Sequence, residues 1–452
     1  MRTGLRARPG PAAAPDPAPD RKSVSGAVGP EARWEERVLR AAHPLAYPAL
    51  RSARGRPVVR VPRIGVIVND AAIAREVLLD LDHFSKVGPG APSDLWTPVL
   101  GPSVLLNMEG AEHAALRRAL GPLFSPRAVR ELVSGAGGAD VANVVGPPRN
   151  EGADGGGVLP DLTRRLAAGE RVDLAAAVTA QAGAVICGMV GLPPTDDAVR
   201  SAMSAAQTIT GMVRLHRHGL TRSQVVRARE VLERLTAPAR AAYRAGDPAT
   251  VPGRMRDLGL SEREAMGAVG AFVLTGTETI QSFVPRLVAI AHDTGWTARL
   301  LAPDAALRRR AVEEGLRVTV PTPAMLRSVR ADASVGGLPV AAGERVVIAT
   351  VNCCRASGGF DPDRPVDPAV RHLWFGAGPH FCLGMPLAMA QVDVVLDALA
   401  AAATDGRVPV VGRRQAARGV LVPAYRSLEL SLGTAVETGA ETGVETRVEE
   451  IS

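Results

Sequence analysis

One long segment, from Ser261 to about Asp293, limits what this chain can fold into more than any other part of the sequence. It opens with Ser261-Glu-Arg-Glu264, in which the serine and the glutamate three residues later form a capping box, a common helix start. The mostly apolar run AMGAVGAFVLTGTETIQSFVPRLVAIAHD follows. At about 1.5 Å per residue this helix is roughly 50 Å long, enough to cross a whole domain. We therefore expect one long central helix.

The other local signals are mostly helical, with a few short strands. Helix starts are predicted at Ser125, which stands before a proline suited to a first helical position, and at Asp161. Short strands are predicted over Val318–Val320, Ala333–Val340 and Arg345–Ala349, which are separated by Gly and Pro turns. The expected fold class is mainly α with small β-sheets.

Composition excludes several classes of protein. The 452 residues are 46% apolar and 22% charged, which supports a large globular core. The four cysteines have neither the density of a disulfide scaffold nor the CxxC spacing of a zinc site. No stretch approaches the roughly 18 uninterrupted apolar residues of a membrane span, and no apolar segment follows the N-terminal arginines as in a secretory signal. We expect a cytoplasmic protein that does not bind membranes.

The basic balance is a weak indicator of partners. Lys+Arg number 53 against 46 Asp+Glu, a net charge of +7, and only Lys22 and Lys86 are lysines. The arginines are scattered and aromatic residues make up 3%, so solvated faces are favoured over nucleic-acid binding. A basic patch that docks an acidic protein is the alternative.

Both ends of the chain differ from its body. Residues 1–30 hold many prolines among Ala, Arg and Gly, which predicts a disordered leader. Residues 433–452 repeat a Glu-Thr unit and predict a disordered acidic tail. Residues 31–432 are expected to form a single domain.

The most informative segment for chemistry is HLWFGAGPHFCLGMPLAMAQ, residues 372–391, which places Cys382 in a Gly-rich loop before a helix. A helix N-terminus and free backbone N–H groups stabilise a thiolate. The glycines let the backbone approach a flat, bulky partner closely. A lone cysteine suits a metal that takes its other ligands from a macrocycle. The alternative is a Gly-rich turn around a buried cysteine.

This loop resembles the heme-binding signature of the cytochrome P-450 family, FGxGxHxCxG, at every fixed position. The resemblance extends over roughly residues 35–430 and implies the cytochrome P-450 fold, with heme b between the long central helix and the helix of the cysteine loop. It implies that Cys382 is the iron ligand. The other cofactor-binding residues that it implies in this loop are Phe375, Gly376, His380 and Gly384.

Two further motifs match residues outside the loop. Glu314-Gly-Leu-Arg317 places a glutamate and an arginine on one helix face, and in the family this pair is buried and joins an arginine that here aligns with Arg364. The alternative for such a pair is a surface salt bridge of small value. His113 and Arg117, four residues apart, resemble the family's HxxxR, and with Arg327 and His380 they are expected to bind the two heme propionates.

The long helix carries Thr275-Gly276-Thr277-Glu278-Thr279 in its middle. These residues interrupt an apolar run, which indicates either a solvent-facing stripe or a local helix distortion beside a reactive centre. The segment resembles the family's oxygen-activation motif. Gly276, Glu278 and Thr279 are thereby the expected catalytic residues, with Thr279 bonding dioxygen and Glu278 relaying protons. Thr275 stands where Ala or Gly is usual, and Ile280 where Thr or Ser is common.

The resemblance implies a monooxygenase that inserts one oxygen atom from dioxygen into a lipophilic small molecule, in secondary metabolism. Because no flavin or iron–sulfur motif is present, electrons are expected from a separate ferredoxin and ferredoxin reductase. The residues expected to line the substrate pocket are mostly apolar: Leu95, Trp96, Val104, Phe272, Thr275, Met325 and Leu421. Two alternatives stay open: another heme-thiolate reaction (peroxygenation, nitration or oxidative coupling) and a non-catalytic heme-binding protein.

Overall fold

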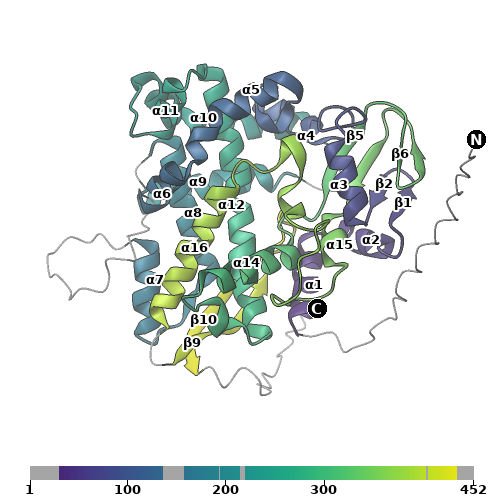
Figure 1. The fold of residues 1–452 in the computed structure, drawn as a ribbon. Helices are drawn as coiled ribbons and strands as arrows, with labels where there is room; N and C mark the ends of the chain where they lie inside the picture. Colours follow the sequence, from purple (N-terminus) through teal and green to yellow (C-terminus); the bar gives the residue numbers. More distant parts are fainter. Residues whose placement is uncertain (1–29, 136–156, 193, 214–218, 404–405, 435–452) are drawn as a thin grey trace, which may run out of the picture.

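Helix α12 (Glu262–Asp293) runs through the middle of the molecule, and helices from both halves of the chain pack around it (Figure 1). The computed structural model describes residues 30–135, 157–192, 194–213, 219–403 and 406–434. The capping box at the start of α12 is present as predicted, because Ser261 Oγ accepts from the Glu264 N–H and the Glu264 side chain accepts from the Ser261 N–H. Mainly helical structure is confirmed.

The helices cover α12 on several sides. Helices α8, α9 and α10, which precede α12 in the chain, pack against it. Helices α14 and α16, which follow α12 in the chain, also contact it. The other α-helices are α1 (Pro30–Ala42), α2 (Ala46–Ala53), α3 (Ala71–Leu79), α4 (Pro92–Leu100), α5 (Gly110–Leu120), α6 (Pro126–Gly135), α7 (Val158–Ala167), α8 (Leu174–Val190), α9 (Asp196–Thr210), α10 (Arg222–Ala245), α11 (Val251–Asp257), α13 (Thr297–Leu300), α14 (Ala305–Thr319), α15 (Thr350–Arg355) and α16 (Met385–Ala402).

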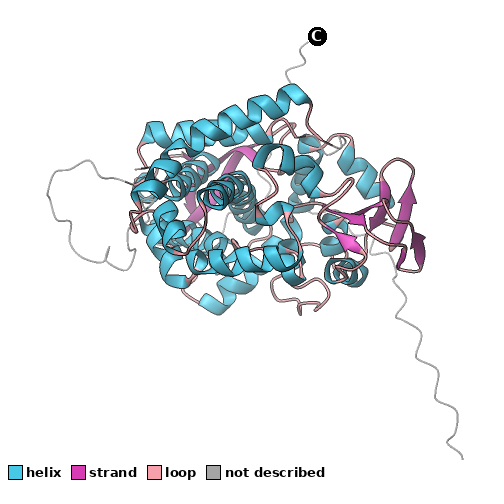
Figure 2. Cartoon of the chain, turned by 90° about the horizontal axis from the view of Figure 1, so that it is seen from above, coloured by secondary structure: helices cyan, strands magenta, loops and turns pink. Residues whose placement is uncertain are grey.

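Three small sheets complete the described structure, and the largest lies at the edge of the molecule beside α2 and α3 (Figures 1 and 2). That sheet has the order β1-β2-β8-β5-β3, in which only β2 and β8 pair in parallel. The second has the order β4-β10-β9, and the third is the β6-β7 hairpin. The strands are β1 (Val58–Val61), β2 (Gly65–Val68), β3 (Phe84–Ser85), β4 (Val172–Asp173), β5 (Met325–Val329), β6 (Ala333–Val335), β7 (Leu338–Val340), β8 (Arg345–Ile348), β9 (Arg407–Ala416) and β10 (Tyr425–Thr434).

Several local predictions from the sequence are corrected. Helix α6 begins after Ser125 as predicted, but α7 begins at Val158, so Asp161 lies inside a helix and does not start one. The strand predicted over Val318–Val320 is the end of α14, where Val318 and Thr319 are the last helical residues and Val320 caps the helix. The strand predicted over Ala333–Val340 is a hairpin, because Gly336 and Gly337 adopt left-handed backbone angles at its turn.

The predicted terminal segments lie almost wholly outside the described residues. Of residues 1–30 the structure describes Pro30, the first residue of α1. Of residues 433–452 it describes Gly433 and Thr434, which end β10.

Helix α16 is long and apolar enough to qualify as a possible membrane span. The sequence did not predict this, because charged residues interrupt the apolar run of α16. Its sequence carries Asp393 and Asp397. Within the described residues α16 packs against α6, α7 and α12, and Val395, Leu396 and Leu399 are fully buried. Its apolar character is accounted for by this burial in the core.

A buried charge network ties the first helix to the centre of the fold. The Glu35 side chain, 2% exposed, accepts hydrogen bonds from Arg286 of α12 (Nε, 3.0 Å) and from Arg355 of α15 (Nη2, 2.7 Å). Arg286 also donates to the carbonyl oxygens of Thr319 (2.6 Å) and Pro423 (3.2 Å). Three helices distant in sequence are thereby joined at one carboxylate, and Arg286 connects them to two further segments.

Removal of this carboxylate should destabilise the fold strongly. Glu35→Gln leaves the buried guanidinium group of Arg286 and the half-buried one of Arg355 without a counter-charge, so we expect the free energy of unfolding to fall by about 3–5 kcal/mol in urea denaturation. Glu36→Gln is the matched control on the same helix, because Glu36 pairs with Arg40 and Arg51 at the surface, and it should cost less than about 1 kcal/mol. Equal effects of the two variants would contradict the role assigned to Glu35.

Candidate active site

The cysteine loop, residues 372–384, contains glycines in backbone conformations that other residues adopt rarely. A short 3₁₀ turn, Leu373–Phe375, is followed by Gly376 (φ 82°) and Gly378 (φ 64°), both in the left-handed region. The Cys382 N–H donates to the Phe375 carbonyl oxygen (2.9 Å) and closes the loop. Helix α16 begins directly after Gly384, with Pro386 in its first turn.

Cys382 differs from the other three cysteines, which are buried, because its side chain borders open space. Protein still surrounds most of the thiol, and this burial raises its pKa. The N–H groups of Gly384 and Met385 and the charge of Arg117 lower the pKa of Cys382 but do not outweigh burial. The predicted effect of the helix N-terminus is therefore present, but alone it does not favour the thiolate.

Helix α12 passes beside the cysteine loop. Leu383, the residue after the cysteine, packs in the same apolar cluster as Phe272 and Val273 of α12. Further along this helix Thr275 is exposed, and a side chain at Gly276 would meet no atom within 4 Å. Open space therefore lies along this part of an otherwise buried helix.

The helix stays regular through this segment, so the distortion expected from the sequence is not observed. The threonine hydroxyls instead donate to carbonyl oxygens four residues earlier, from Thr275 to Ala271 (2.7 Å) and from Thr279 to Thr275 (3.4 Å). Thr277 does the same to Val273 (3.1 Å) and is buried, so it lies on another face. Ile280 is also buried in the core.

A cluster of basic side chains from three segments lies near Cys382, and we call it the basic cluster: His113 and Arg117 of α5, Arg327 of β5 and His380 of the cysteine loop. The rings of His113 and His380 lie 4.4 Å apart, centroid to centroid. Both ring nitrogens of His380 and the Nε of Arg327 are buried without a hydrogen-bond partner in the described structure. Burial and neighbouring cations lower the pKa of His380, and burial lowers the pKa of Arg327 to about 10.

This cluster fits a ligand with carboxylate groups. Buried donors without acceptors are rare in folded proteins and mark the place of an absent partner. The carboxylates of heme propionates supply such acceptors, and Arg117 and Arg327 carry the charges that match them. The exposed thiol, the open space beside Gly276 and the basic cluster together fit heme.

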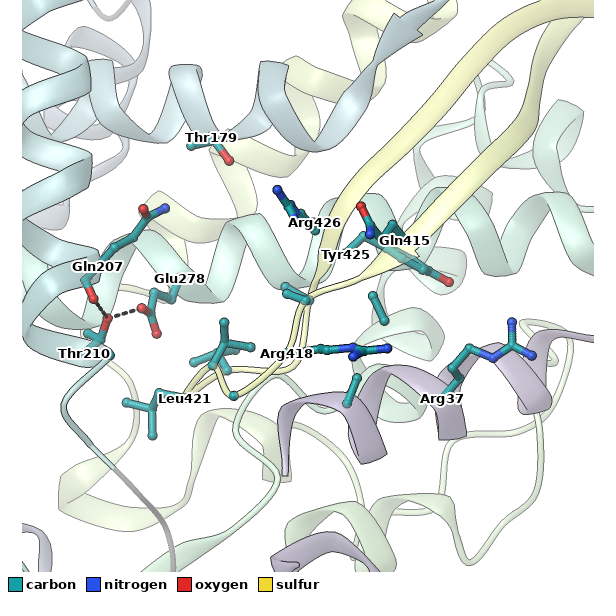
Figure 3. Close-up of a pocket in the computed structure, with 18 of the residues that line it drawn as sticks. Arg37, Thr179, Gln207, Thr210, Glu278, Gln415, Arg418, Leu421, Tyr425 and Arg426 are labelled. Atoms are coloured by element: carbon teal, nitrogen blue, oxygen red, sulfur yellow. Dashed lines mark hydrogen bonds between the residues drawn. The ribbon is translucent and has the colours of Figure 1, made fainter. Parts of the chain in front are cut away.

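Glu278 lines a cavity other than the open space beside Gly276 (Figure 3). One carboxylate oxygen accepts from Thr210 of α9, and the other is buried without a partner among the described residues. Burial raises the pKa of Glu278, with the Thr210 bond opposing. The cavity, about 900 Å³, lies between α1, α8, α9, α12 and the turn that joins β9 to β10. Glu278 therefore joins the central helix to this solvent-connected cavity.

The residues predicted to line a substrate pocket lie in separate clusters. Leu95, Trp96 and Leu421 meet in one small apolar cluster with Leu274 of α12. Phe272 instead packs edge-to-face on Phe124, with ring centroids 5.2 Å apart. The remaining members are Val104, which is 1% exposed, Met325, which packs at the edge of the largest core cluster, and the exposed Thr275 of α12.

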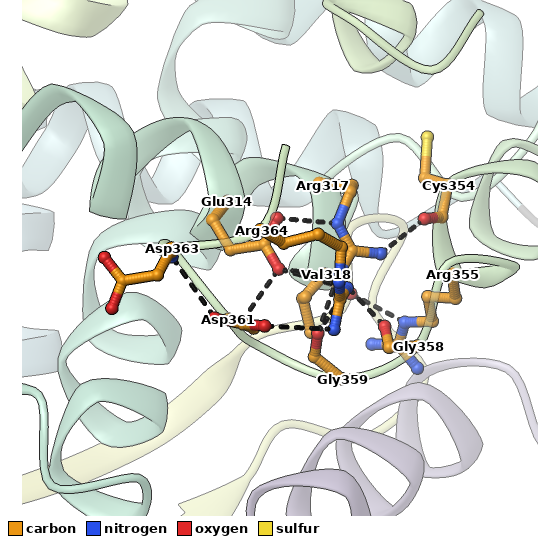
Figure 4. Close-up of polar contacts among 10 residues, drawn as sticks. All are labelled: Glu314, Arg317, Val318, Cys354, Arg355, Gly358, Gly359, Asp361, Asp363 and Arg364. Atoms are coloured by element: carbon orange, nitrogen blue, oxygen red, sulfur yellow. Dashed lines mark hydrogen bonds and ion pairs between the residues drawn. The ribbon is translucent and has the colours of Figure 1, made fainter. Parts of the chain in front are cut away.

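The glutamate and arginine of the upstream motif form the bidentate pair that was expected (Figure 4). Arg317 donates to both Glu314 oxygens at 2.7 Å and also to the Cys354 (2.6 Å) and Gly359 (2.7 Å) carbonyl oxygens. The Nη1 atom of Arg364 lies 3.6 Å from the Oε1 atom of Glu314. The pair thus fixes the chain segment that precedes the cysteine loop onto α14.

Three charged residues near the basic cluster were not singled out from the sequence. Lys86 follows β3, and burial and the charge of Arg327 lower its pKa to about 8. Glu109 accepts from Ser85 Oγ (2.6 Å) and from Arg330 Nη2 (2.6 Å). Only the rarity of lysine in this chain could have marked Lys86, since no motif contains it.

Comparison with known proteins identifies the family. Residues 306–399 match the cytochrome P-450 family model. The erythromycin C-12 hydroxylase of Saccharopolyspora erythraea is 30% identical over 324 residues, 66% of this chain and 73% of that protein. The 20-oxo-5-O-mycaminosyltylactone 23-monooxygenase of Streptomyces fradiae is 29% identical over 312 residues, 65% of this chain and 66% of that protein.

Solved structures agree on the fold. A mutant of the cytochrome P-450 EryK in complex with erythromycin B superimposes with a TM-score of 0.67 and 23% identity, over 91% of this chain and 99% of that chain. The chain therefore belongs to the cytochrome P-450 family. It is an oxidoreductase with the cytochrome P-450 fold, and family and fold imply a heme cofactor.

The raised pKa of Glu278 predicts a pH-dependent effect on stability. The folded state holds this proton more tightly than the unfolded state, so its contribution is present below the unfolded value of 4.5 and is lost as pH rises through the folded pKa. Glu278→Gln should therefore gain stability relative to the wild type as pH increases from 4.5 to 8. Urea unfolding at several pH values measures the difference. Glu264→Gln is the control: the pKa of Glu264 is shifted downward, so this variant should not gain stability over the wild type as pH rises.

Proposed function

We propose that this enzyme is a heme-thiolate monooxygenase that inserts one oxygen atom from dioxygen into a lipophilic small molecule of secondary metabolism. The observation that carries the proposal is the single exposed thiol of Cys382 beside helix α12, which has open space at Gly276, three residues before Thr279. The relatives named above support the reaction class, because their printed names are those of a hydroxylase and a monooxygenase.

The proposed cofactor is heme b. Cys382 would hold its iron, and Phe375, Gly376 and Gly384 would shape the loop around the cysteine, since a larger residue at Gly376 would be strained. His113, Arg117, Arg327 and His380 would bind its propionates. When bound, heme supplies the redox chemistry, and a cysteine thiolate favours cleavage of the O–O bond.

The residues of α12 would control protons. Gly276 leaves room beside the helix, and the Thr279 hydroxyl would hold a proton near dioxygen. Glu278 would exchange protons with the cavity that it lines, because its raised pKa keeps the carboxyl protonated over a wider pH range. Glu314, Arg317 and Arg364 have no proposed part in the reaction and serve the fold.

A lipophilic substrate is supported by the apolar cluster that Leu95, Trp96 and Leu421 form beside α12. Electrons would come from a separate ferredoxin and ferredoxin reductase, since the sequence shows no flavin or iron–sulfur motif. We place the enzyme in the cytoplasm, with residues 31–432 as one domain.

The proton role of Thr279 is testable by coupling. In Thr279→Ala, electron consumption should continue while product formation falls on the order of 100-fold and hydrogen peroxide accumulates, because a positioned proton donor is lost. Product, peroxide and NAD(P)H are measured together with a surrogate ferredoxin system and a substrate found by spin-state screening.

Thr277→Ala is the matched control, because its hydroxyl is buried on another face of the same helix. It should keep the wild-type ratio of product to electrons. If wild-type enzyme formed product only with added peroxide and never with dioxygen and electrons, the peroxygenase alternative would replace the proposal. Labelled dioxygen distinguishes the two sources of the inserted atom.

A further inference from the structure

Lys86 is the only lysine among the described residues, and the mechanism above leaves it without a role. It directly follows β3, whose Phe84 and Ser85 pair with β5. Its side chain is partly buried beside the basic cluster. No described carboxylate lies within ion-pair distance of the Lys86 ammonium group, and no described acceptor bonds it.

The neighbours of Lys86 are mostly cations. The backbone N–H of Lys86 donates to the same Glu109 oxygen that lies 3.8 Å from His380 Nε2, and the centroid of the His113 ring lies 4.4 Å from that of His380. Lys86 thus lies beside both rings, and after burial its charge is the main cause that lowers the pKa of each. Burial, Arg327 and Arg117 in turn lower the pKa of Lys86, while the charge of Glu109 opposes them only in part. A partly buried ammonium group among further positive charges is costly unless an anion joins them.

The nearby carboxylate of Glu109 does not meet this need. Its oxygens accept from Ser85 Oγ, from the backbone N–H of Lys86 and from Arg330, so it fixes the backbone of residue 86 rather than the side chain. Because β5 pairing and Glu109 both hold this segment, the Lys86 side chain extends from a fixed anchor.

We propose that Lys86 is a positioning residue that binds a propionate carboxylate of the heme, in addition to His113, Arg117, Arg327 and His380. The inference rests on the proposed heme site. An ammonium group is a compact point charge with three donors, which suits a carboxylate that an arginine already grips from one side. The four sequence-predicted residues would then not be the complete set.

Heme release from the purified holoenzyme tests the proposal. Lys86→Met should release hemin to excess apomyoglobin on the order of 10-fold faster than wild type, because one charge-assisted contact is lost. Lys86→Arg should restore most of the retention. Lys22→Met, which removes the only other lysine of the sequence, should leave the rate unchanged. Wild-type release rates in Lys86→Met would overturn the proposal.

Two spectroscopic readouts separate a contact from a general effect on stability. Loss of a positive charge near the iron should lower the reduction potential in Lys86→Met but not in Lys86→Arg. The propionate bending bands in resonance Raman spectra should shift in Lys86→Arg, a variant that keeps charge and so remains measurable if Lys86→Met fails to fold. Unshifted bands would refute the contact. A purified wild-type protein without heme would instead refute the proposed function itself.

Discussion

Buried positive charges are costly unless negative charges pair with them, and this constraint governs the site around Cys382. Arg117, Arg327 and Lys86 converge with two histidines from separate segments, yet the one nearby carboxylate, Glu109, is occupied by other donors. Such an arrangement is stable only when an anionic ligand completes it. A heme supplies two carboxylates at one edge and a cation for Cys382 at its centre. In the proposed function, the basic cluster and the cysteine loop would therefore be halves of one binding site.

Two buried ion-pair networks place these halves relative to each other. The Glu314–Arg317 pair binds carbonyl oxygens of Cys354 and Gly359, which fixes the chain before the cysteine loop. Glu35 holds Arg286 of α12 and Arg355 of α15 together. Arg317 connects α14 to an irregular segment, and Arg286 connects α12 to the turn between β9 and β10 through the Pro423 carbonyl oxygen, where backbone partners within regular structure are not available. The geometry of the site thus depends on residues that never touch a ligand.

The sequence predicted elements where local chemistry decides structure. The capping box at Ser261 and the glycines around Cys382 encode their own geometry, and both could be read directly. The strand predicted over Val318–Val320 is wrong because a Val-Thr-Val run suits a strand or a helix end equally, and only the packing of α14 decides. Lys86 and the separation of the predicted pocket residues into several clusters depend on contacts between distant segments. Such contacts leave no local pattern in a single sequence.

The central claim is that Cys382 ligates a heme iron as a thiolate. The absorption spectrum of the reduced, carbon-monoxide-bound protein tests it directly, in the wild type and in Cys382→His. We expect the wild type to show the long-wavelength Soret band of thiolate-ligated heme, and the variant to lose it. A wild-type Soret band at the position of histidine-ligated heme would contradict the account, as would a thiolate band that persists in the variant.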